Sequence, residues 1–224
     1  MTRTTSRATP SSRLRSVAVI GALIASTALS GCAAVLVGGA VVGGTLLATD
    51  RRSSGAQIDD QSIELKANNR IREVLGDRGH VNITSYNRIV LLTGEVPTEE
   101  NKAAIEQGVS RMDNVRATVN ELVVATASSL SNRSNDALVT SKVKATLVDA
   151  GDISANAFKV VTERSIVYLM GRVTEREADR AVNLTRSIGG VQKVVRVMEV
   201  VSEAELAEID PNTAPKTSTA GPRP

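Results

Sequence analysis

The sequence predicts an α+β protein built from two tandem small α/β-sandwich domains. The stretch IVLLTGEVPTEENKAAIEQ from Ile89 recurs from Ile166 as IVYLMGRVTEREADRAVNL, an offset of 77 residues. Aromatic residues are almost absent, so apolar burial must come from Val, Ile, Leu and Ala, which suits compact layers of short helices and β-branched strands. Two copies indicate a tandem of like domains, because a solenoid needs at least three repeats.

The two copies align further if one residue is deleted near Gly189. Val115 then pairs with Val191, and Val119 pairs with Val195. Each copy has the order helix, strand, strand, helix, strand. We therefore expect two domains, each with a three-stranded mixed sheet covered by two helices.

In the first copy, assigned to residues 58–124, a helix is predicted from an N-cap at Asp60 to a stop at Gly76. Its apolar residues recur at helical spacing on one face. Strands follow at 81–86 and 89–93 around a tight turn, and Gly94 is expected to end the second strand. Thr98 caps a second helix, and residues 116–124 form the last strand.

The second copy, residues 136–202, repeats this order. Asp136 is the expected N-cap of a helix that Gly151 ends, and strands follow near 158–162 and 165–170. Thr174 and Glu177 predict a capping box, and residues 191–201 the final strand. The linker at 125–135 is rich in Ser and Asn, and the tail at 203–224 has no core to join, so we expect it to be disordered.

The amino-terminal part predicts an export signal. Residues 1–31 hold four arginines, no acid and an apolar stretch too short to span a bilayer. Cys32 follows directly, in the sequence Leu29-Ser30-Gly31-Cys32. It is the only cysteine of the chain, so it forms neither an internal disulfide nor a metal site. Residues 32–57 continue the apolar run as a tether, whose Gly pairs each weaken a helix by roughly 1 kcal/mol per glycine. A spanning helix that contains Cys32 is the alternative.

Charge and composition argue against nucleic acid and against catalysis. Four of the 27 Lys and Arg lie in the leader, which leaves 23 against 24 Asp and Glu, so no uncompensated basic charge is available for phosphate backbones. His80 is the only histidine and falls in a predicted turn. Glu99, Glu100, Glu175 and Glu177 are typical helix N-terminal charges rather than an acid/base pair. We expect no catalytic residues, no metal and no cofactor.

Three segments carry a resemblance to a known family: ATDRRSSGAQIDD at 48–60, IVLLTGEVP at 89–97, and MGRVTEREA at 170–178. They resemble the dual-BON outer-membrane lipoproteins of the DolP type. Leu-Ser-Gly-Cys resembles a lipobox, which implies cleavage before Cys32 and acylation there, and Ala33 in place of Asp implies sorting to the outer membrane. The resemblance implies a non-enzymatic, lipid-anchored protein that faces the periplasm, binds anionic phospholipid and supports envelope integrity, also at division sites.

In this family the lipid-facing surface lies around the first helix of the second domain, which implies residues 137–139 here, with Leu138 in place of an aromatic. On a helical wheel, Leu138 lies off the buried face with Lys142 one turn along, and Lys144 lies near Val148. We expect Leu138, Val139, Lys142 and Lys144 to contact lipid. Singly exposed apolar residues are also ordinary on soluble proteins. The alternatives are an adaptor for periplasmic cell-wall or outer-membrane assembly proteins, with lipid only as anchor, and a stress-related chaperone.

Overall fold

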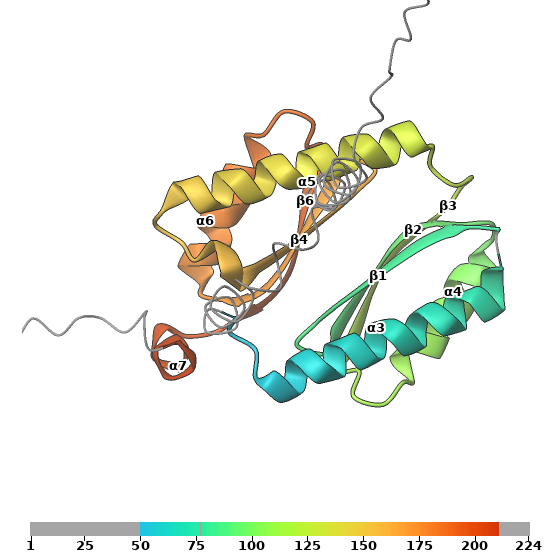
Figure 1. Cartoon of the computed structure of the whole chain (residues 1–224), viewed down its shortest axis with the longest axis horizontal. Coiled ribbons are helices and arrows are strands. Elements are labelled where there is room, and N and C mark those ends of the chain that lie inside the picture. Colours follow the sequence, from blue (N-terminus) through green and yellow to red (C-terminus); the bar gives the residue numbers. More distant parts are fainter. Residues whose placement is uncertain (1–49, 77, 211–224) are drawn as a thin grey trace, which may run out of the picture. The chain divides into compact units, whose positions relative to one another are not determined.

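The computed structural model describes residues 50–76 and 78–210 (Figure 1). The described residues all belong to one unit of the chain, Thr49–Pro224. Cys32, the predicted signal and the tail from residue 211 lie outside the described residues, as does most of the predicted tether. No helix among the described residues is long and apolar enough to cross a membrane.

Domain 1 comprises two helices and three strands: α3 (Ser54–Leu75), β1 (His80–Tyr86), β2 (Ile89–Val96), α4 (Glu99–Ser110) and β3 (Ala117–Val124). Domain 2 repeats them with a short 3₁₀ turn added: α5 (Leu130–Ala150), η1 (Ala155–Ala157), β4 (Phe158–Glu163), β5 (Ile166–Val173), α6 (Glu175–Arg186) and β6 (Lys193–Val200). A last helix, α7 (Glu203–Ile209), follows.

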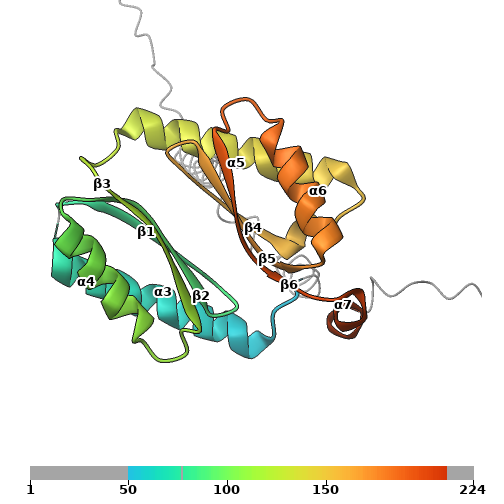
Figure 2. The ribbon, with the colours of Figure 1, turned by 180° about the vertical axis from the view of Figure 1, so that it is seen from behind.

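Each domain has one mixed three-stranded sheet with its second strand in the middle. The strand orders are β1-β2-β3 and β4-β5-β6; the first pair is antiparallel and the second pair is parallel in both sheets. Two helices cover one face of each sheet, α3 and α4 in domain 1 and α5 and α6 in domain 2 (Figures 1 and 2). The predicted fold class is confirmed.

Each helix pair and sheet enclose an aliphatic core. Ile63, Ala67 and Ile71 of α3 pack with Val90 and Leu92 of β2 in domain 1. Val139, Val143 and Leu147 of α5 pack with Val167 and Leu169 of β5 in domain 2. The i, i+4 spacing on the helices and the alternation along the strands are the periods that the sequence shows.

A third apolar cluster joins the two domains. Alternation along β2 and β5 turns Leu91 and Met170 away from the helix-covered faces. Both side chains are fully buried, in one cluster with Tyr86, Tyr168 and Val197. The sheet face that each domain leaves bare of helices therefore contributes to a shared core.

The first helix of each domain begins seven residues earlier than predicted. Ser53 caps α3 and Ser129 caps α5, each with a hydroxyl that accepts from the third residue on. The predicted N-caps Asp60 and Asp136 are instead buried within the helices. The predicted linker therefore narrows to the residues before α5, and α3 starts inside the predicted tether.

Asp60 and Asp136 each bind a β-hairpin turn of their own domain. The Asp60 carboxylate accepts from the backbone N–H groups of Asn87 (2.8 Å) and Arg88 (2.7 Å). The turn residues have φ of 49° and 66° and, in domain 2, 54° and 62°, typical of type I′ turns. These hydrogen bonds connect residues 27 to 29 positions apart, a separation that helix-capping patterns do not describe.

The equivalence of the two copies also differs from the predicted alignment. α4 (Glu99–Ser110) and α6 (Glu175–Arg186) correspond at an offset of 76, so the extra residue of the first copy is Pro97 and not a residue near Gly189. Burial agrees, because Ile105 and Ala181 are both buried whereas Ala104 is exposed. Gly94 does not end β2, which continues to Val96.

Other terminal signals are confirmed. Thr98 caps α4, Thr174 and Glu177 form the capping box of α6, and Gly76 and Gly151 lie at the C-caps of α3 and α5. The expected disorder from residue 203 is wrong for 203–209, which form α7. Ser202 caps this helix and its Leu206 is buried, so the segment does have a core to join.

Candidate functional site

The inner face of α5 belongs to the core of domain 2. Val139 is only 2% exposed and packs with Val143 and Leu147. Its predicted role in lipid contact is therefore wrong for this fold, because a lipid could reach Val139 only if α5 left the sheet. Leu138, one residue earlier, lies about 100° around the helix.

The outer face of α5 presents an uncharged stripe. Leu130, Leu138 and Val148 are 79%, 62% and 65% exposed. Between them lie small residues without charge: Ser134, Ala137, Ser141 and Ala145, all exposed. We call these seven residues the outer stripe. Exposed aliphatic side chains of this size normally mark a surface that meets another apolar phase when they are grouped.

Lys142 and Lys144 flank the outer stripe on opposite sides. At 100° per residue, Lys142 lies about 40° from Leu138 toward one edge, and Lys144 about 120° toward the other. Both side chains are exposed, and neither ammonium forms an ion pair within residues 50–76 and 78–210. Apolar groups between unneutralised cations are the pattern of a surface helix that meets anionic lipid.

A shallow hollow adjoins the Lys144 edge. Its volume is about 280 Å³, and Leu147, Val148, Phe158 and Val160 line it together with Lys144, the only charged residue of the lining. Phe158 is the only phenylalanine of the chain and opens β4. The hollow extends the apolar surface from the helix onto the sheet edge.

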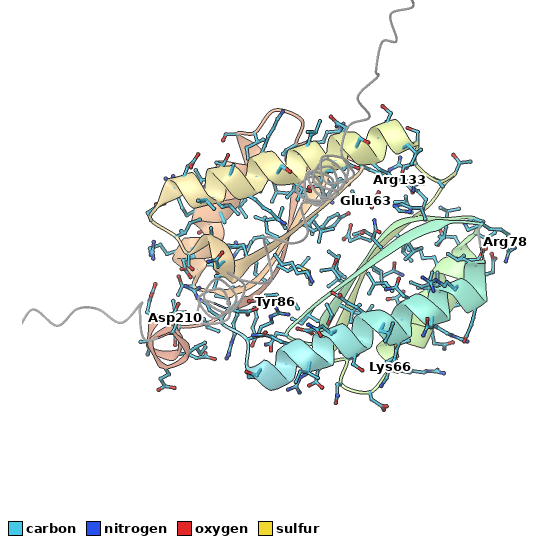
Figure 3. The ribbon with its side chains drawn as sticks, viewed as in Figure 1. Lys66, Arg78, Tyr86, Arg133, Glu163 and Asp210 are labelled. Carbon is cyan, nitrogen blue, oxygen red and sulfur yellow. The ribbon has the colours of Figure 1, made fainter. Side chains whose placement is uncertain are left out.

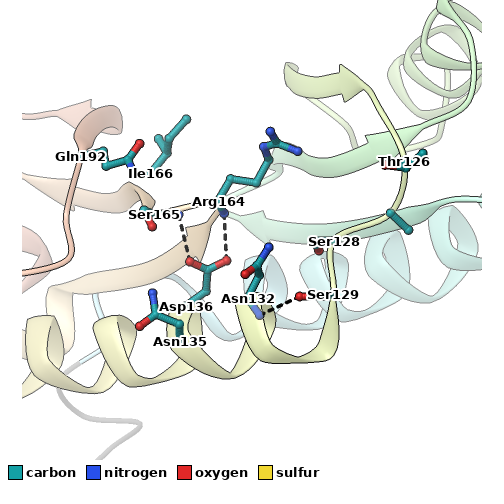
Figure 4. Close-up of a pocket in the computed structure, with 11 residues that line it drawn as sticks. Thr126, Ser128, Ser129, Asn132, Asn135, Asp136, Arg164, Ser165, Ile166 and Gln192 are labelled. Atoms are coloured by element: carbon teal, nitrogen blue, oxygen red, sulfur yellow. Dashed lines mark hydrogen bonds between the residues drawn. The ribbon is translucent and has the colours of Figure 1, made fainter.

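A larger polar groove of about 640 Å³ lies at the start of α5 (Figure 4). Both carboxylate oxygens of Asp136 point into the β4–β5 turn and accept from the backbone N–H groups of Arg164 (2.8 Å) and Ser165 (2.9 Å). Arg164 Nη1 in turn lies 3.3 Å from Glu95 Oε1. These polar groups therefore hold the turn and the domain boundary, and they form no pair of nucleophile and base.

His80 lies elsewhere than the sequence predicts. It opens β1, is half-buried, and its Nε2 lies 3.9 Å from Glu163 Oε2 (Glu163 is labelled in Figure 3). Burial, and then the positive charge of Arg133, lowers the pKa of His80 below 6.5. Burial raises the pKa of Glu163 above 4.5, and nearby Glu95 and Asp136 add to this effect. No group of three or more His, Cys, Asp or Glu among the described residues could hold a metal ion.

The segment Asp50–Arg52, which we call the strap, precedes α3 and binds domain 2. The Arg51 side chain has no solvent exposure, and its Nη1 and Nη2 donate to the two Glu177 carboxylate oxygens at 2.7 and 2.9 Å. Nη1 also donates to the Arg172 carbonyl (3.2 Å), and Nε lies 3.7 Å from Asp210. No sequence pattern predicted this site, although Arg51 and Glu177 both lie in the segments that carry the family resemblance.

The next residue of the strap binds domain 1. Arg52 donates to Asp60 (2.8 Å) and to Asp50 (2.6 Å), and its guanidinium lies 4.6 Å from the centre of the Tyr86 ring. Burial would lower the pKa of Arg52, but these two carboxylates raise it above its ordinary value. Two adjacent arginines thus connect the strap to both domains.

This duplicated fold defines the class of protein. The BON domain matches residues 59–126 and 135–202, so the chain belongs to the BON-domain family and contains two such domains. The BON-domain proteins form a non-enzymatic family.

Relatives narrow the class further. The chain is 35% identical over 190 residues to the outer membrane lipoprotein DolP of Haemophilus influenzae, covering 84% of this chain and 97% of the relative. It is 30% identical to a 21 kDa hemolysin of Actinobacillus pleuropneumoniae (68% and 79% covered) and 31% identical to the osmotically-inducible protein Y of Escherichia coli (41% and 48% covered). The chain is thus a dual-BON lipoprotein of the DolP type, lipid-anchored at the outer membrane and facing the periplasm.

Proposed function

We propose that this lipoprotein binds anionic phospholipid through the outer stripe of α5 and thereby helps to maintain the cell envelope, including at the division site. The observation that carries the proposal is the outer stripe itself, three well-exposed aliphatic side chains between two unpaired lysines. The aliphatic groups enter the acyl region while the ammonium groups meet lipid phosphates. The protein acts by binding, without catalysis.

We assign the lipid anchor to Cys32. Its acyl chains would hold the domains near the bilayer, so that a weak contact becomes populated through effective concentration. Leu138, Lys142 and Lys144 can then suffice where a soluble protein would need a larger surface. The mass of the mature protein tests the assignment: it should show cleavage before Cys32 together with acyl chains.

Vesicle binding by a form of the chain that begins after Cys32 tests the lipid surface. We expect this form to bind vesicles that contain phosphatidylglycerol and to bind phosphatidylcholine vesicles weakly. Leu138→Asp combined with Lys142→Glu should reduce the affinity at least about tenfold, since each cation near an anionic bilayer contributes about 1 kcal/mol. The control pair is Leu65→Asp with Lys66→Glu on α3, where an exposed leucine also adjoins a lysine. Equal loss in both pairs would contradict the assignment to α5.

A second function rests on domain 1. Ile58 and Leu65 are both exposed on α3, seven residues apart and thus on one side of the helix. These two exposed apolar side chains support a role of the protein as an adaptor for periplasmic cell-wall or outer-membrane assembly proteins. Capture of a periplasmic partner that Leu65→Asp abolishes, with no vesicle binding by the acyl-free form, would favour the adaptor over the lipid-binding function.

A further inference from the structure

A second hollow of domain 2 lies between the end of α6 and the start of β6. Its volume is about 410 Å³, and it is lined by Arg186, Val191, Gln192, Lys193 and Val194. Two side chains are cationic, one amide can donate, and no carboxylate contributes to the lining. This composition is complementary to an anion.

The cations of this hollow differ from the other basic residues of α6 and β6. Arg180 pairs with Asp152 at 2.8 Å, and Arg196 pairs with Glu175 at 2.7 Å and with Asp179 at 3.1 Å. Within the described residues, Arg186 and Lys193 form no ion pair. The neighbouring carboxylates are therefore engaged elsewhere, and the charge of the hollow is not neutralised.

The loop that lines this hollow packs against α5. A Cβ added at Gly190 would lie 2.9 Å from Val139 Cγ2, so the loop touches the inner side of α5 at Val139. Lys142 is three residues after Val139 and lies on the same flank of α5. Lys142, Arg186 and Lys193 are thus three cations of domain 2 without an ion pair among the described residues, one on α5 and two at the ends of the connection that packs against α5.

The domain repeat shows that the BON fold does not require a cation at these two positions. Arg186 and Lys193 are the last residue of α6 and the first residue of β6. The last residue of α4 is Ser110 and the first residue of β3 is Ala117. Domain 1 therefore has neutral side chains at these two positions and carries its charges elsewhere in the connection, at Arg111, Asp113 and Arg116.

We propose that this hollow binds the phosphodiester of an anionic lipid headgroup, with Arg186 and Lys193 as its ligands and Gln192 as an additional donor. The guanidinium of Arg186 suits two phosphate oxygens at once, and Lys193 supplies a point charge. The inference rests on the proposed lipid-binding function and adds a headgroup site to the outer stripe. A free phosphate ester has the same chemistry and is the other possible source.

The test follows amide hydrogen exchange in the acylated full chain, reconstituted in nanodiscs of phosphatidylcholine with or without phosphatidylglycerol. Phosphatidylglycerol should protect the 186–193 loop. Arg186→Glu with Lys193→Glu should lower the docking equilibrium constant roughly 30-fold, because each cation contributes on the order of a fivefold factor. Arg186→Gln with Lys193→Gln serves as the milder variant if charge reversal destabilises α6, whose last turn favours a cation. Lys66→Glu with Arg111→Glu, two exposed cations of domain 1, matches the charge change.

The outcomes separate this site from the proposed function. If Leu138→Asp abolishes the lipid response while both Arg186/Lys193 variants retain it, the outer stripe stands and the headgroup site is overturned. If the loop responds to soluble glycerol phosphate in the wild type but not in the variants, while phosphatidylglycerol has no effect, the site binds phosphate esters and the lipid source is overturned. No response of the loop to either probe overturns the site altogether.

Discussion

At the scale of single residues, buried carboxylates determine how the helices meet the hairpins. Asp60 and Asp136 occupy equivalent positions in α3 and α5 and accept from the same two backbone N–H groups of each type I′ turn. Asp60 also accepts from Ser85 Oγ at 2.6 Å. Each carboxylate accepts hydrogen bonds from turn N–H groups that a helix covers and that would otherwise lack a partner.

We expect Asp136→Ala to destabilise the protein by about 2 kcal/mol, because two backbone donors lose a charged acceptor. Urea unfolding should show a lower midpoint at an unchanged slope. Asp149→Ala is the matched control, since Asp149 is exposed on the same helix. A loss of the same size in the control would show that the effect arises from α5 as a whole rather than from the turn.

The Arg51–Glu177 pair predicts a pH dependence. Burial alone would raise the pKa of Glu177, but the hydrogen bonds from Arg51 and from the Thr174 N–H lower it below 4.5. A carboxyl whose pKa is lowered on folding contributes stability above the ordinary pKa, and this stability is lost as the pH falls through the folded-state pKa. The wild type should therefore lose this contribution below pH 4.5.

Glu177→Gln should remove that part of the acid dependence while keeping the capping box, because Gln is accepted at this position. At pH 7, Arg51→Ala should destabilise by about 3 kcal/mol, since it leaves a buried carboxylate unpaired. Urea midpoints measured from pH 7 downward test both statements, with Arg70→Ala, which breaks an exposed pair, as control. A wild-type acid slope that Glu177→Gln leaves intact would contradict this explanation.

At the scale of elements, capping residues in the sequence correctly predicted most helix ends. Thr98, Thr174, Gly76 and Gly151 mark helix ends because their side chains or backbone conformations act within one turn. The starts of α3 and α5 were mispredicted because aspartate is both a common N-cap and a good acceptor for a distant turn. The Arg51 site could not be predicted either, since an arginine next to a second arginine is normally solvated and only the fold brings Glu177 to it.

Of the candidate site, sequence periodicity correctly separated Leu138 and Lys142 from the buried face of α5. Periodicity could not show that Lys142 and Lys144 form no ion pair with a described carboxylate, because ion pairs depend on side chains from other elements. The hollow at Arg186 and Lys193 arises from a helix end, a loop and a strand together. No motif with a fixed residue spacing predicts such a site from the sequence.

The central strands predict a further sensitivity to small changes. A Cβ on Gly171 would collide with the Ala157 carbonyl, just as a Cβ on Gly94 would collide with the His80 carbonyl. Gly171→Ala should therefore cost about 2 kcal/mol, because the first strand of the sheet must shift. Gly189→Ala, where an added Cβ would meet nothing within 4 Å, should be close to neutral. Thermal unfolding of the two variants tests the contrast, and equal melting temperatures would refute it.

At the scale of the whole described unit, the two BON domains are not independent. Leu91 and Tyr86 of domain 1 share an apolar cluster with Tyr168 and Met170 of domain 2. Polar contacts surround it: Lys159 lies 3.0 Å from Glu64, and Asn82 donates to Glu163 at 2.7 Å. A duplicated unit whose bare sheet faces are covered by each other exposes less apolar surface than either domain alone.

Two neighbouring leucines of β2 test this coupling, because they face opposite sides of one sheet. Leu91→Ala removes contacts of the shared cluster, whereas Leu92→Ala removes contacts within domain 1 only. Each should cost about 3 kcal/mol. Native-state hydrogen exchange should show that Leu91→Ala weakens protection in both domains. Domain 2 packs against the Leu91 side chain, so its truncation makes local opening of domain 2 easier even while domain 1 stays folded. Leu92→Ala should leave the exchange of β5 and α5 unchanged. If Leu91→Ala affected domain 1 alone, the shared cluster would contribute nothing to domain 2.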